Sequence, residues 1–89
     1  VANLDTPNHD AVAKQLIEYY QSYAEMFPNN QLAPEMLFKA GNQAVNLQEY
    51  DLALTKYFFV EQYYLNYLKR PECLFLQAFV YETYKNEYG

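Results

Sequence analysis

The feature that most constrains the fold of this chain is an internal repeat. The segment Pro34-Glu-Met-Leu-Phe38 recurs as Pro71-Glu-Cys-Leu-Phe75, with four identical residues in five and a separation of 37 positions. Further pairs at this separation share identity or small size: Tyr20 and Tyr57, Asn29 and Asn66, Gly41 and Ala78. A period of this length is typical of proteins whose units stack because no unit can bury its apolar face alone.

Apolar residues recur every three or four positions in four segments, which is the spacing of an amphipathic helix. This spacing predicts helices over about residues 7–27, 34–47, 51–68 and 71–88. Proline stands at the first helical position after Thr6 and again at Pro34 and Pro71, while Pro28 follows the end of the first helix. Links of roughly three to six residues make consecutive helices antiparallel neighbours. We expect one all-α domain over residues 1–89.

Composition excludes several classes of function. Six Lys and Arg against eleven Asp and Glu give a net charge of −5, and no basic run offers a footprint for nucleic acid or an anionic membrane surface. The longest apolar runs, such as that from Tyr57 to Val60, are far shorter than the roughly 20 residues that span a bilayer. We therefore expect neither a nucleic-acid partner nor a membrane span. Because the chain begins at Val1 without methionine, we expect it to be a piece of a longer protein.

Residues that could carry chemistry are few and scattered. His9 is the single histidine and Cys73 the single cysteine, so a zinc site with about four ligands has no basis. We expect His9 to be exposed and Cys73 to be a small buried hydrophobe. Neither Gly41 nor Gly89 belongs to a glycine-rich phosphate loop. The sequence predicts no catalytic, cofactor-binding or metal-ligating residue, and no enzyme.

The stretch from Pro34 to Leu65 resembles a tetratricopeptide repeat. Leu37, Gly41, Ala53 and Tyr57 match its first large apolar, first small, second small and aromatic positions. The resemblance implies four antiparallel helices stacked as helical hairpins, with the last repeat lacking its second helix. Leu65 stands where the terminal proline of the pattern would recur, so the third helix is expected to run longer, to about Leu68.

The segment from Phe27 to Leu54 is similar to repeats of envelope lipoproteins of Gram-negative bacteria. That resemblance implies a protein–protein interaction scaffold of an envelope protein, in the periplasm or anchored to the outer membrane. The alternative is a lipoprotein built on the same repeats that binds a carbohydrate or small ligand. The absence of tryptophan weighs against sugar binding.

The concave face of such a stack is built by the first helix of each hairpin. By resemblance, the partner-binding residues on this face are Glu35, Phe38, Asn42, Val45, Phe75, Phe79 and Glu82. Their aromatic, apolar and acidic character suits an apolar or basic peptide segment. The competing interpretation is that several of them only pack one repeat against the next.

The last predicted helix has no partner to cover its apolar strip, which contains Leu74, Phe75, Ala78 and Phe79. An uncovered strip of this kind marks an interaction site. We expect either another copy of the chain, forming a homo-oligomer, or a further segment of the protein to cover it.

Overall fold

The computed structural model describes residues 8–88, and this part of the chain is all-helical. Its four helices are α1 (Asn8–Met26), α2 (Ala33–Asn46), α3 (Tyr50–Tyr63) and α4 (Arg70–Tyr88). No strand occurs within the described residues. The prediction of an all-α fold with four helices is confirmed, while the expected helix start at Thr6-Pro7 lies outside the described residues.

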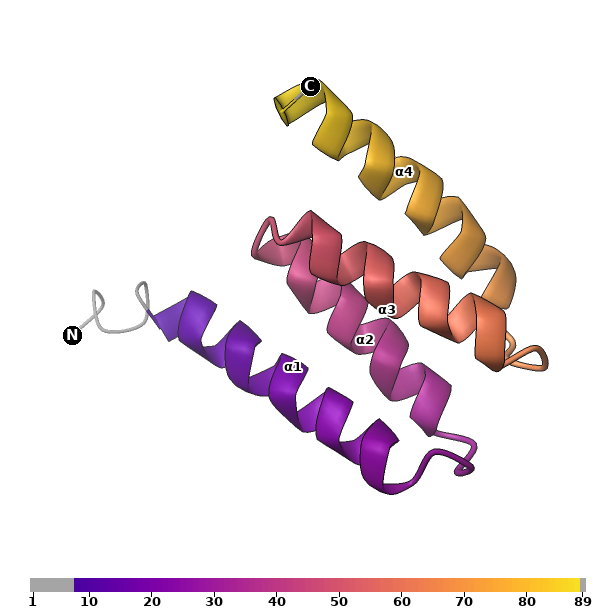
Figure 1. Ribbon diagram of the computed structural model, residues 1–89. Coiled ribbons are helices and arrows are strands. Elements are labelled where there is room, and N and C mark those ends of the chain that lie inside the picture. The colour runs from indigo at the N-terminus through magenta and orange to yellow at the C-terminus, as the bar shows by residue number, and fades with distance from the viewer. Residues whose placement is uncertain (1–7, 89) are drawn as a thin grey trace.

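Each helix packs on the next one in the sequence and runs antiparallel to it (Figure 1). The helices α2 and α3 form the middle of the molecule, and α1 and α4 lie at its two opposite edges (Figure 1). Pro34 and Pro71 each lie in the first turn of their helix, where a missing backbone N–H leaves no intrahelical bond unmade. None of the helices in the described part is long and apolar enough to cross a membrane.

The backbone repeats with the same period as the sequence. The ends of α1 and α3, Met26 and Tyr63, are 37 residues apart, and so are the starts of α2 and α4, Ala33 and Arg70. The hydrogen bonds of the two connecting turns also correspond. In the first turn the donor and acceptor pairs are Phe27 to Tyr23, Asn30 to Phe27, Ala33 to Asn30 and Met36 to Leu32, and each recurs 37 positions later in the second. The chain therefore builds the same helix–turn–helix unit twice.

This repeated turn corrects the predicted end of the third helix. α3 ends at Tyr63, about five residues before the predicted end at Leu68, and Tyr64 leaves the helical region with φ −119° and ψ 71°. Without proline, the chain still turns here because residues 64–70 make the same three turn hydrogen bonds as residues 27–33. Residue 65 therefore lies in the link and not in the helix.

The core lies between α2 and α3 and extends to the inner faces of the outer helices. Tyr57 is its largest fully buried side chain, and Val60, Cys73 and Val80 are buried with it. Tyr57 packs against Gly41, where an added Cβ would lie 2.6 Å from the Cε1 atom of the ring. The small residue at position 41 therefore has a steric cause: it admits the aromatic ring between α2 and α3.

Candidate functional site

The seven residues predicted to form a binding face divide into two groups in the structure. Those on α2 are engaged inside the protein, whereas those on α4 are exposed. The exposed fraction of the side chain is 7% at Phe38 but 68% at its repeat counterpart Phe75. Phe38 is therefore a packing residue between elements of the fold, as the competing interpretation holds.

The α2 members contact α3 and the link that follows it. The Phe38 ring lies 5.9 Å from the Tyr57 ring and 6.2 Å from the Tyr67 ring, centroid to centroid, with the Lys69 ammonium over it at 5.3 Å. The Tyr57 hydroxyl donates to Asn42 Oδ1 at 2.5 Å. Val45 is half-buried against the same core. These contacts hold α2 to α3 and leave little of the three residues to offer a partner.

Glu35, the remaining α2 member, lies in a network at the start of its helix. Its carboxylate accepts a hydrogen bond from the Tyr67 hydroxyl and lies 3.5 Å from the Lys69 ammonium. The pKa of Tyr67 is raised by burial and further by this bond to Glu35. The two corresponding turns line an open groove of about 800 Å³ beside Glu35. Because Glu35 is already paired with Tyr67 and Lys69, its carboxylate is not an unpaired group for a ligand in this groove.

The α4 members form an exposed apolar surface. The rings of Phe75 and Phe79 stack with their centroids 6.4 Å apart and an interplanar angle of 15°. Leu74, Ala78 and Tyr81 are also exposed on this helix. We call these five residues the open α4 face; it consists of Leu74, Phe75, Ala78, Phe79 and Tyr81. Glu82, the last predicted member, is exposed beside it and three residues beyond Phe79.

The opposite side of α4 is bound to α3. Cys73 and Val80 are buried there, at 0% and 1% exposure. Burial raises the pKa of the Cys73 thiol to about 11, and the carboxylates of Glu72 and Glu61 add to the shift. At neutral pH this thiol is protonated and is not a nucleophile. Cys73 is thus the small buried hydrophobe that the sequence predicts, and His9 is exposed, as predicted.

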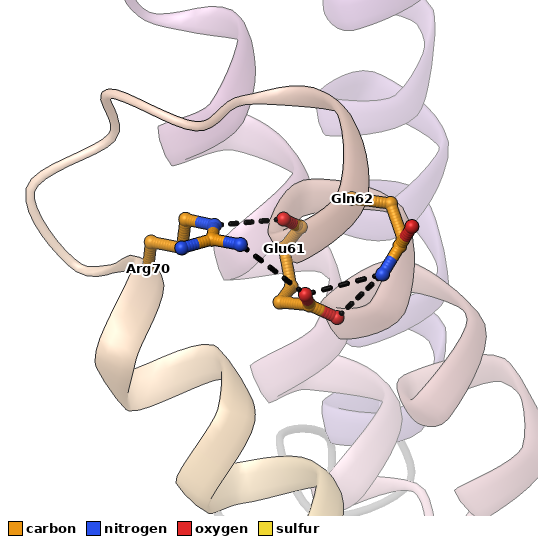
Figure 2. Close-up of polar contacts among 3 residues, drawn as sticks. All are labelled: Glu61, Gln62 and Arg70. Carbon is orange, nitrogen blue, oxygen red and sulfur yellow. Dashed lines mark hydrogen bonds and ion pairs between the residues drawn. The ribbon is translucent and has the colours of Figure 1, made fainter.

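An ion pair that was not foreseen from the sequence fixes the start of α4 on the end of α3. The Arg70 Nε–H donates to the backbone oxygen of Glu61 at 2.8 Å, and its Nη2 lies 3.4 Å from the Glu61 carboxylate (Figure 2). Gln62 donates to both carboxylate oxygens at 3.1 Å (Figure 2). Arg70 therefore caps one of the last carbonyls of α3 and neutralises a buried charge.

The repeat itself contained the signal for this pair. Alanines 24 and 33 occupy the corresponding positions in the first unit, and both are buried. In the second unit both small residues are replaced together, by one acid and one base of opposite charge. Alignment of the two units at 37 positions would have indicated that Glu61 and Arg70 are in contact.

A small apolar pocket lies between α1 and α3. Its volume is about 280 Å³, and Leu37, Phe59 and Tyr64 supply much of its lining. The Lys56 ammonium donates to Gln21 Oε1 at 2.5 Å, and burial lowers the pKa of Lys56 while the charge of Glu25 opposes the shift. Since Lys56 already has a hydrogen-bond acceptor, it is not an unpaired donor for a ligand in this pocket. We therefore take the open α4 face as the candidate site.

Comparison with known proteins gave no match, whether to a protein-family model, a curated protein or a solved structure.

Proposed function

We propose that the chain is a non-enzymatic protein–protein interaction scaffold of the tetratricopeptide type. Its binding surface is the open α4 face, and its ligand is an amphipathic helix of a protein partner. The observation that carries this proposal is the contrast between Phe38 and Phe75, which occupy the same place in two corresponding units. Tyr57 of α3, together with Tyr67 and Lys69 of the following link, covers Phe38, whereas Phe75 is 68% exposed.

The chemistry of the open α4 face favours a helical, apolar ligand. In the first unit, the α2 residues that correspond to Phe75 and Ala78 receive α3, whose Tyr57 ring packs against them. Two stacked aromatic rings supply a large apolar area with little side-chain entropy to lose, which is the character of energetically dominant interface residues. Binding then needs no covalent step, because a fixed helix face buries apolar surface against its partner.

The location of this scaffold is proposed from the resemblance to envelope lipoproteins. We propose that it belongs to a bacterial envelope protein, in the periplasm or held at the outer membrane by a lipid anchor. The sequence of the full gene tests this point. A signal segment followed directly by a cysteine supports it, and a cytoplasmic protein without such a segment contradicts it.

Capture from a Gram-negative envelope extract tests the function. The bait is the wild-type chain, compared with the double variant Phe75→Lys/Phe79→Lys. Lysines at these positions lie three residues from Glu72 and Glu82, so they form favourable pairs on the helix surface and should leave it folded. The matched control is Tyr63→Lys, which changes an aromatic residue on α3 that is 69% exposed.

The proposal expects a defined protein that the wild type and the Tyr63→Lys chain retain equally and the double variant loses. The retained protein is then titrated in purified form against the three chains by calorimetry, where the double variant should bind about thirtyfold more weakly or worse. A glycan array is run in parallel. Glycan binding without a protein partner, or capture that the double variant leaves unchanged, contradicts the proposal.

A further inference from the structure

α1 carries two apolar faces. One contains Ala13, Ile17 and Ala24, which are buried. The other consists of Leu16, Tyr20 and Tyr23, which lie at intervals of four and three positions and so share a single side of the helix. We call this set the second α1 face. All three are half-buried.

The second α1 face corresponds, through the 37-residue repeat, to the side of α3 that packs on α2. Ala53, Tyr57 and Val60 on that side are at most 1% exposed. Their counterparts in α1 are Leu16, Tyr20 and Tyr23, all only half-buried. Within residues 8–88 no helix occupies, beside α1, the place that α2 occupies beside α3. The lack of such a neighbouring helix accounts for the greater exposure of the three α1 residues.

The open α4 face is the other half of the same interface. On α2, Phe38 and Gly41 receive the Tyr57 ring, and Asn42 accepts its hydroxyl hydrogen bond. The counterparts on α4 are Phe75, Ala78 and Phe79, all exposed. α4 therefore carries a surface of the kind that receives a helix, and α1 carries a surface of the kind that is received. These two helices lie at opposite edges of the molecule (Figure 1).

We propose that the helix bound by the open α4 face is α1 of a second copy of this chain, so that copies associate head to tail. This inference rests on the proposed function and names the partner. α4 of one copy and α1 of the next would form a hairpin like that of α2 and α3. The 37-residue repeat would then continue from one copy into the next.

The chemistry of the two surfaces is compatible. The second α1 face has no charged member, so the acidic residues beside the open α4 face, Glu72 and Glu82, meet no carboxylate within it. One contact changes, because Ala78 replaces Gly41 and its methyl group would meet Tyr20. The Tyr20 ring is half-buried and not enclosed like that of Tyr57, so it can move aside. The Tyr57–Asn42 hydrogen bond is replaced by the apolar pair of Tyr20 and Phe79.

Association through two different surfaces does not stop at a dimer. Each copy that binds through α4 still presents a free α1 face, so the assembly grows into a ring or a filament. A symmetric pairing of α4 with α4 would instead stop at two copies. The dependence of mass on concentration and the effect of changing each surface distinguish these arrangements.

The experiment is sedimentation equilibrium of the purified chain across a range of concentrations, with one variant for each surface. Phe75→Lys/Phe79→Lys changes the open α4 face, and Tyr20→Lys/Tyr23→Lys changes the second α1 face. Phe75 and Phe79 are more than half exposed and Tyr20 and Tyr23 are half-buried, so circular dichroism checks that each variant keeps the fold. The control that should leave association unchanged is Tyr63→Lys, at a residue of α3 that is 69% exposed and lines the groove between the two turns of the same copy.

The proposal expects the average mass of the wild type to rise with concentration beyond two copies. Each double variant alone should associate about thirtyfold more weakly, and an equimolar mixture of the two should form a one-to-one dimer through the remaining intact pair of surfaces. A wild type that stays monomeric overturns the proposal, as does an α1 variant that still dimerises or a mixture that stays monomeric. If the wild type is monomeric but retains an envelope protein in the capture experiment, self-association is contradicted and the proposed function stands. The two outcomes can be told apart because the capture experiment tests a different ligand.

Discussion

The Cε1 atom of Tyr57 lies 2.6 Å from the point that a β-carbon on Gly41 would occupy. The ring cannot retreat easily, since Tyr57 is 1% exposed and its hydroxyl donates to Asn42. This close approach sets the spacing of α2 and α3. It is also the template for the interface proposed between copies.

Gly41→Ala should destabilise the fold even though alanine favours a helix. Overpacking of a core costs about 1–3 kcal/mol, and the better helix propensity of alanine returns up to about 1 kcal/mol. We expect the free energy of unfolding in urea to fall by about 1–2 kcal/mol. The control is Gln43→Ala, at a half-buried helical position two residues away. An unchanged or higher stability for Gly41→Ala contradicts the described packing.

Arg70→Ala should weaken the junction of α3 and α4. The change removes the hydrogen bond to the Glu61 carbonyl and leaves the Glu61 carboxylate, 9% exposed as a residue, without its cation. Because Arg70 itself is partly exposed, we expect a loss of about 1–2 kcal/mol in urea unfolding. Lys69→Ala removes the more exposed pair with Glu35 and should cost less than about 1 kcal/mol. Equal losses for the two variants would contradict the account.

Stability should fall at high pH, in part through Tyr57. Burial, and to a lesser extent the neighbouring Cys73, raises the pKa of Tyr57 from 10.0 to about 12. Because the pKa of Tyr57 is higher in the folded state, the stabilisation that this residue contributes is complete below pH 10. It is lost as the pH rises from 10 to about 12. Tyr57→Phe should therefore reduce the fall in unfolding free energy between pH 9 and 11, compared with the wild type. Parallel pH profiles for the two chains would show that Tyr57 is not the titrating group.

The Cys73 thiol should react slowly in the folded protein. It is fully buried, and its pKa is raised to about 11, so little thiolate forms at pH 8. We expect iodoacetamide to label it much faster in urea than in buffer at the same pH. Rapid labelling of the folded chain would mean that α4 does not rest on α3 as described.

The sequence predicted well those parts of the fold that local chemistry determines. Pro34 and Pro71 mark helix starts through the fixed φ of proline, and the described starts fall within one residue of them. The end of α3 was missed because position 65 holds leucine where the pattern has proline. The structure shows that the repeated hydrogen bonds of the turn, and not proline, end this helix.

The predicted site could be resolved only in three dimensions. Phe38 and Phe75 stand in nearly identical five-residue segments, so no local pattern could tell which is buried. Burial is decided by whether a neighbouring helix is present, which is a tertiary property. The pairing of Glu61 with Arg70 could have been inferred from the sequence alone. Aligning the two units shows that an acid and a base together replace two alanines of the first unit.

The most direct test of the central claim is a cross-link between the two outer helices of different copies. In a Cys73→Ala background, one chain carries Ala78→Cys and the other Tyr20→Cys, at the positions that correspond to Gly41 and Tyr57. On mild oxidation of the mixture, we expect a disulfide that joins position 78 of one chain to position 20 of the other, faster than either chain alone dimerises. Cross-links that form as readily within each single-variant sample, or no 78-to-20 product in the mixture, would contradict the claim that the open α4 face receives α1.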